Sequence, residues 1–161
     1  MKILLCILLF GACSSVGYYY KYKCQTESDF LKFLQKFENF YDSNMTLFKN
    51  NILEIVENFK NSLKGKDVKF SQIFSCKSNM TTIDEVALKK FISDEASYSV
   101  ILNFLKTIGK NDYEFEKEKN KNFENYLKSA CFNAGEKCEK KGNLYFKLSL
   151  ALGAVICIIV W

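Results

Sequence analysis

Cysteine is the residue type in this sequence that offers the widest choice of chemistry, with seven among 161 residues. A structural zinc site would need pairs at Cys-x-x-Cys spacing, and no such pair occurs. Cys6 and Cys13, like Cys131 and Cys138, are seven residues apart and share a helical face. We interpret most cysteines as small apolar residues. Four would form two disulfides in an extracellular domain and stay reduced in the cytoplasm. These are Cys24, Cys76, Cys131 and Cys138.

General acid–base groups are sparse. Histidine is absent, which removes the commonest general base and the usual partner of a catalytic serine. Glu114, Glu116 and Glu118 alternate with lysines, a pattern typical of a solvated helix face with ion pairs. There is no glycine-rich phosphate loop. The sequence therefore predicts a protein that is not an enzyme, with no catalytic, cofactor-binding or metal-binding residue and no small-molecule substrate.

The overall charge also limits the partners. The net charge is +5, and the lysines are spread among Glu and Asn instead of forming one stripe, so we predict no nucleic-acid partner. Hydrophobic residues make up 48% of the chain and charged residues 25%. This composition is typical of a folded chain and not of a disordered tail.

An apolar segment lies at each end. Residues 3–20 carry no charge, and four tyrosines near Lys21 stand where an interfacial aromatic belt would stand. Residues 144–161 carry a single charge, Lys147, which can snorkel to the interface. We predict three parts: an N-terminal transmembrane segment at 1–20, a helical domain at 21–143 and a C-terminal transmembrane segment at 144–161.

Basic residues border both apolar segments on the side of the middle domain. They are Lys21, Lys23, Lys137, Lys140 and Lys141. By the positive-inside rule, the domain at 21–143 faces the cytoplasm, and both termini lie outside a cell membrane that the chain crosses twice.

Other interpretations of the ends remain open. The first segment could be a cleaved signal peptide, or a lipoprotein signal with Phe10–Cys13 as its lipobox. The two ends together could be a secretory signal and a GPI-anchor signal with its small-residue site at 133–135. Asn44 and Asn79 would then be glycosylation sites, and the domain would lie outside the cell.

The middle of the chain shows apolar residues at helical spacing. Residues 30–41 and 45–63 form two such stripes, which predict an antiparallel helical hairpin with its turn near Asp42-Ser43-Asn44. Residues 68–74 fit a short helix or an extended link, and residues 75–82 read as loop. Thr82 with Glu85 forms a capping box for a helix through Ile92.

Two further helices follow. Ser93-Asp94 starts one, and residues 109–112 form a turn. From Tyr113 a charged helix carries Phe115, Phe123, Tyr126, Leu127, Ala130 and Ala134 on one face, and it can run on into the last apolar segment. The fold class predicted is all-α, an antiparallel helical bundle flanked by an N-terminal and a C-terminal transmembrane helix.

Several stretches resemble the stage III sporulation protein AB family of endospore-forming bacteria. Residues 16–23 are similar to the family's exit from its first membrane segment, and residues 101–112 to its Leu-Gly-x-Ser-Asp turn with the preceding helix. Tyr145–Trp161 is similar to the family's apolar tail. Asn111-Asp112 stands in place of the family's Ser-Asp, and Glu116 in place of the Gln that follows. With these differences, the sequence resembles a divergent member of the stage III sporulation protein AB family.

The resemblance implies a structural role. Such proteins are related in pattern to the inner-membrane platform proteins of type II secretion machines. They belong to the channel complex between mother cell and forespore that endospore formation requires. The expected partners are the membrane and other stage III sporulation proteins, including a hexameric secretion-type ATPase, and a homo-oligomer is compatible with such a scaffold. The domain would face the mother-cell cytoplasm.

Overall fold

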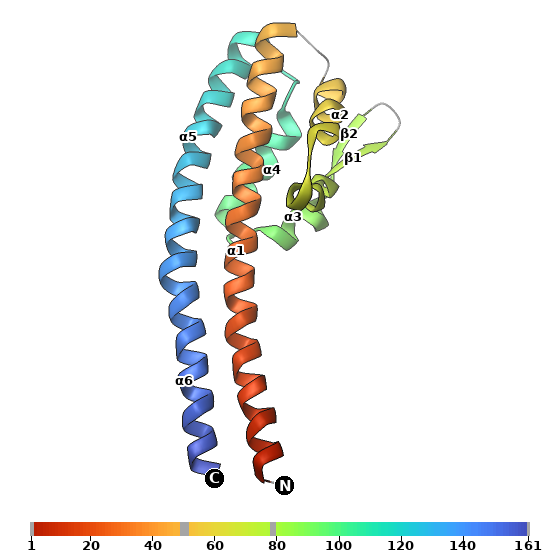
Figure 1. Ribbon diagram of the computed structural model, residues 1–161. Coiled ribbons are helices and arrows are strands. Elements are labelled where there is room, and N and C mark those ends of the chain that lie inside the picture. The colour runs from red at the N-terminus through yellow and green to blue at the C-terminus, as the bar shows by residue number, and fades with distance from the viewer. Residues whose placement is uncertain (1, 49–51, 78–79, 161) are drawn as a thin grey trace. The chain divides into compact units, whose positions relative to one another are not determined.

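The computed structural model describes residues 2–48, 52–77 and 80–160. Most of these residues are helical (Figure 1). The elements in chain order are α1 (Lys2–Phe48), α2 (Ile52–Ser62), η1 (Gly65–Ile73), β1 (Phe74–Lys77), β2 (Met80–Ile83), α3 (Glu85–Phe91), α4 (Glu95–Thr107), α5 (Tyr113–Lys137), η2 (Cys138–Gly142) and α6 (Asn143–Val160). The helical fold class is confirmed, with long apolar helices at both ends of the chain.

The chain divides into two compact units. The first, called the terminal unit below, consists of Met1–Ser28 and Cys131–Trp161. The second, called the central unit, is Asp29–Ala130. Helices α1 and α5 each contribute residues to both units.

Aromatic residues at helical spacing build the core of the central unit. Phe30, Phe33 and Phe37 on α1 are fully buried. Helix α2 returns along α1 (Figure 1), and its Phe59 packs on Phe33 and Phe37 with ring centroids 5.5 and 5.1 Å apart. The predicted antiparallel hairpin of helices is therefore present.

The predicted turn of that hairpin is in the wrong place. Residues 42–44 are helical, and Ser43 Oγ and Asn44 Nδ2 donate to backbone carbonyls one turn earlier, at 2.9 and 2.7 Å. Polar side chains that bond back in this way sit inside a helix without ending it. Helix α1 continues through Phe48 and α2 begins at Ile52, so the two helices are separate elements on either side of residues that lie outside the description, and Asn79 of the second glycosylation sequence also lies outside it.

A short β-hairpin replaces the loop predicted at 75–82. Strands β1 and β2 pair antiparallel, with Phe74 opposite Ile83. The loop prediction counted polar residues, but the run Thr81-Thr82-Ile83 is β-branched and favours a strand. The segment before β1 is the 3-10 helix η1, so of the two alternatives for residues 68–74 the helical one holds through Ile73.

Two aspartates begin the next helices. Asp84, not Thr82, caps α3 by accepting from the Ala87 amide at 2.9 Å, and Thr82 belongs to β2. Asp94 caps α4 by accepting from the Ser97 amide, as predicted. Gly109 has φ 73°, a left-handed conformation that suits glycine and forms the predicted turn before α5.

Candidate functional site

The cysteines are the first candidates for a metal-binding or disulfide-forming site. Among the described residues, no group of three or more His, Cys, Asp and Glu side chains is placed to hold a metal ion. Six cysteines carry described side chains and form no disulfide with one another: Cys6, Cys13, Cys24, Cys131, Cys138 and Cys157. The side chain of Cys76 lies outside the described residues. The disulfide alternative and the absence of catalytic residues both stay predictions.

A first buried polar cluster joins α1 to α5 inside the central unit. Asn120 Nδ2 donates to Glu38 Oε1 at 2.9 Å and to Asp42 Oδ1 at 3.0 Å. Glu38 is 2% exposed and Asn120 is 1% exposed. Glu38 Oε2 and Asn120 Oδ1 are buried without a hydrogen-bond partner among the described residues. The Asn120 amide thus donates both of its N–H groups to carboxylates. Glu38 Oε2 and Asn120 Oδ1 remain as acceptors without a donor in the described part of the chain.

The surroundings of Glu38 favour its protonated form. Burial raises the pKa of Glu38, and the nearby carboxylates of Glu124 and Asp42 raise it further. The hydrogen bond from Asn120 and the charge of Lys128 offset this in part, and the pKa is raised to about 7. A proton on Glu38 supplies the donor that this pair of buried acceptors lacks.

A second buried cluster fastens the turn before α5. Glu116 is 2% exposed and accepts from Asn111 Nδ2 at 2.8 Å and from Tyr41 Oη at 3.4 Å. Lys119 Nζ lies 3.0 Å from Glu116 Oε1 and also donates to the Thr107 carbonyl at 2.9 Å. One carboxylate and one ammonium therefore tie α1, the end of α4, the turn and the first turns of α5 together.

The charge of Glu116 is compensated. Burial alone raises the pKa of Glu116, but hydrogen bonds from Lys119 and Asn111 and the charge of Lys119 outweigh it and leave the pKa below its usual value. Burial and the adjacent Glu116 charge raise the pKa of Tyr41. The cluster holds an ionised carboxylate beside an ammonium in a hydrogen-bonded network, an arrangement that fixes the positions of the helices.

The prediction of a solvated face was wrong for Glu116. Glu114 and Glu118 are exposed, as expected. Glu116 instead lies on the buried stripe of α5 with Asn120, Phe123 and Leu127. Extending the apolar stripe of this helix backwards at helical spacing reaches Glu116, so the signal was present in the sequence. Phe115, which the prediction grouped with Phe123 and Leu127 on one face of the helix, is 59% exposed, whereas Phe123 and Leu127 are buried.

In the terminal unit, α1 and α6 run antiparallel in contact. Cys6 and Cys157, here called the inner thiol pair, each place Sγ near the other's carbonyl oxygen, at 3.9 and 3.4 Å. A Cβ on Gly17 would collide with the Ser149 hydroxyl, and one on Gly153 would lie 3.0 Å from the Phe10 ring. Small residues let two helices approach this closely in lipid.

Helices α1 and α6 also have the apolar composition of membrane-spanning segments. Helices covering Leu4–Met45 and Tyr113–Ile159 are long and apolar enough to cross a membrane. Their large apolar side chains, such as Leu8, Val16, Leu152 and Ile158, are exposed. An exposed apolar surface of this kind is costly in water and is expected in lipid.

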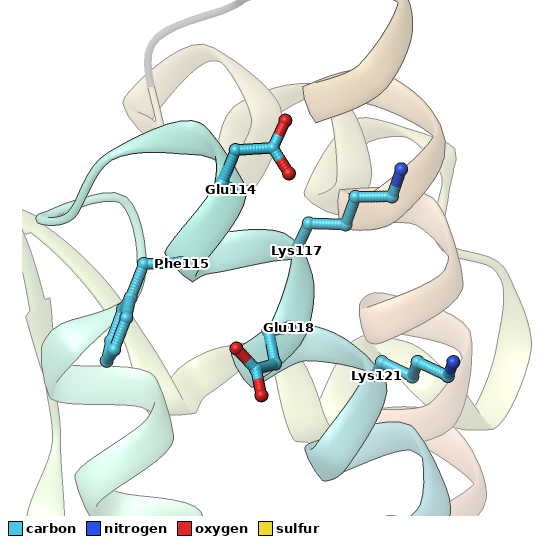
Figure 2. Close-up of a pocket in the computed structure, with 5 residues that line it drawn as sticks. All are labelled: Glu114, Phe115, Lys117, Glu118 and Lys121. Atoms are coloured by element: carbon cyan, nitrogen blue, oxygen red, sulfur yellow. The ribbon is translucent and has the colours of Figure 1, made fainter.

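The outer face of α5 carries a shallow hollow. Figure 2 shows its lining, which comes from a single helix: Glu114, Phe115, Lys117, Glu118 and Lys121. Phe115 points away from the two lysines in this view. A hollow lined by one helix lacks the enclosing walls of a small-molecule site. An exposed aromatic ring among charged groups is typical of a protein-binding surface.

Together these features define a helical protein with two helices that can cross a membrane, in which the buried polar groups fasten helices to one another. The family model described as stage III sporulation protein AB matches residues 2–161. The chain belongs to the stage III sporulation protein AB family, as its resemblance predicted. Neither a curated protein nor a solved structure matches the chain significantly.

Proposed function

We propose that this chain is a membrane-anchored structural subunit of the mother cell–forespore channel complex. In this role it is a platform for partner proteins, including a hexameric secretion-type ATPase. The observation that carries the proposal is the match of the family over residues 2–161, a range that includes both apolar helices.

The arrangement of charge supports a cytoplasmic position for the middle of the chain. Residues 21–143 would face the mother-cell cytoplasm, between transmembrane segments at 1–20 and 144–161. Lys21 and Lys23 follow the first apolar segment, and Lys140 and Lys141 precede the last one. The positive-inside rule assigns these flanks to the cytoplasm.

The polar cluster around Glu116 supports a scaffold role. Glu116 and Lys119 hold the turn at 109–112 against α1 and α5, so the outer face of α5 has a fixed shape. A platform subunit needs surfaces held in position, and Phe115 on that face is free to contact a partner's apolar residue.

Gene deletion in the bacterium that encodes the chain tests this function. The deletion strain should engulf the forespore and then fail to make heat-resistant spores, and the full-length gene should restore them. A gene lacking the codons for 144–161 should not restore spores, because its product has one anchor. Normal numbers of heat-resistant spores in the deletion strain would overturn the proposal.

Partner capture tests the platform role separately. Full-length tagged protein, solubilised from sporulating cells in mild detergent, should co-purify with a secretion-type ATPase. The same chain solubilised from growing cells that express it serves as the control. If the full-length gene restores sporulation but no ATPase co-purifies with its product, the platform role is contradicted and the function is limited to structural support.

A further inference from the structure

The terminal unit concentrates positive charge at one level of its helical hairpin. Residues 21–28 and 131–147 contain six lysines and three glutamates, a net charge of +3, whereas residues 29–130 contain sixteen lysines and fifteen acidic residues, a net charge of +1. The six lysines, here called the basic band, are Lys21, Lys23, Lys137, Lys140, Lys141 and Lys147.

Two of the three glutamates at this level are already committed to lysines. Glu27 lies 3.9 Å from Lys137 Nζ, and Glu136 lies 2.8 Å from Lys140 Nζ. Lys23, Lys141 and Lys147 are exposed and make no ion pair with any residue in the described part of the chain. The band therefore keeps an excess of positive charge that its own helices do not neutralise.

Both helices contribute because they touch at this level. Gly142 ends the π-helical segment η2, and a Cβ there would lie 3.8 Å from Lys21 Cα. Lys21 Nζ sits 5.4 Å from the centre of the Phe146 ring. A π-helical segment widens the helical turn and changes the direction of its side chains. Here the change falls on Lys140 and Lys141.

Exposed aromatic and aliphatic surface borders the band on one side. Tyr18, Tyr19, Tyr22 and Tyr145 are exposed at the same level, and Tyr20 packs on Tyr145 with ring centroids 4.6 Å apart. Exposed Val16 and Leu148 continue the apolar surface directly beyond them. A ligand that covers both the basic band and the adjoining apolar surface has an anionic head beside an apolar tail.

We propose that the basic band binds the headgroups of anionic phospholipids. The lysines contact the lipid phosphates, the tyrosines lie at the headgroup level, and the acyl chains lie along α1 and α6. An acidic protein segment or a free phosphate would use the lysines alone and leave the adjoining apolar surface uncovered. This inference rests on the proposed insertion of both apolar helices in the membrane.

The test is lipid selectivity measured by electron spin resonance on the full chain reconstituted in phosphatidylcholine bilayers. Spin-labelled phosphatidylglycerol should associate with the protein about threefold to tenfold more strongly than spin-labelled phosphatidylcholine. K21Q/K23Q/K141Q/K147Q, which removes band lysines that form no ion pair among the described residues, should bring this ratio close to one. The matched control K64Q/K66Q/K90Q/K110Q removes four lysines from the central unit and should leave the ratio unchanged.

The outcomes separate this inference from the function on which it rests. A restricted phosphatidylcholine signal with equal association of both lipids would overturn lipid recognition while leaving membrane insertion intact. The absence of any restricted lipid signal would overturn insertion itself. Displacement of the labelled phosphatidylglycerol by inorganic phosphate alone would also overturn the proposal, because the site would then recognise phosphate and not lipid.

Discussion

Replacing Glu38 by glutamine is expected to stabilise the central unit, and to do so only at neutral and higher pH. Glutamine keeps the oxygen that accepts from Asn120 Nδ2. Its amide nitrogen takes the place of the buried oxygen that has no partner, and it can donate to Asn120 Oδ1, the second buried acceptor without a partner. The substitution also removes a carboxylate that lies close to Asp42 and Glu124.

The magnitude follows from the raised pKa of Glu38, which is about 7 in the fold against an ordinary 4.5. Because the folded pKa is the higher one, stability from this group is complete below the ordinary pKa and is lost as the pH rises through 7. Between about pH 5 and about pH 8 the wild-type chain should lose about 2 kcal/mol from this residue. The glutamine variant should lose none of it.

Urea unfolding of the full chain in detergent, followed by far-ultraviolet circular dichroism, measures this difference, with the membrane hairpin as a constant background. Glu114→Gln is the matched control, because Glu114 is an exposed glutamate on α5. Its replacement should change the free energy of unfolding by less than about 0.5 kcal/mol. A Glu38→Gln variant that is less stable than wild type at about pH 8 would refute the reasoning, since Glu38 would then be a well-solvated carboxylate.

Three other predictions concern packing and surface. Glu116→Ala should cost about 3 kcal/mol in urea unfolding, since Lys119 keeps its charge at 19% exposure; a cost below about 1 kcal/mol would contradict the cluster's role. Gly17→Leu should lower oxidative cross-linking of the inner thiol pair, whereas Gly11→Leu should not, because a Cβ at Gly11 meets nothing within 4 Å; equal yields would contradict the close packing. Phe115→Ser should leave stability within about 0.5 kcal/mol but reduce ATPase recovery, and unchanged recovery would exclude this face.

The sequence predicted the features that depend on spacing along one helix. The stripe from Phe30 to Tyr41, the cap at Asp94 and the turn at Gly109 all appear where expected. Helical conformation continues from Tyr113 through Val160, as the charged helix and the apolar tail together indicated. In each case a local rule of periodicity, capping or backbone freedom decides the outcome.

Features that depend on distant partners were missed. Helical spacing alone could have shown that Glu116 is buried with Asn120 and Leu127, but not that Tyr41, far away in the chain, donates to it. Glu38 and Asn120 meet across two helices, and neither residue type marks a buried position by itself. Strands β1 and β2 are stabilised by pairing with each other, and the polar composition of residues 75–82 gives no sign of that pairing.

Measuring on which side of the membrane the central unit lies tests the proposed cytoplasmic platform most directly. A chain with all native cysteines replaced and Ser99→Cys introduced places one thiol on an exposed position of α4. A membrane-impermeant maleimide should label it only after the cells are permeabilised, whereas a cysteine appended after residue 161 should be labelled in intact cells. Labelling of Ser99→Cys in intact cells would contradict a cytoplasmic platform and would favour a secreted, lipid-anchored or GPI-anchored surface protein.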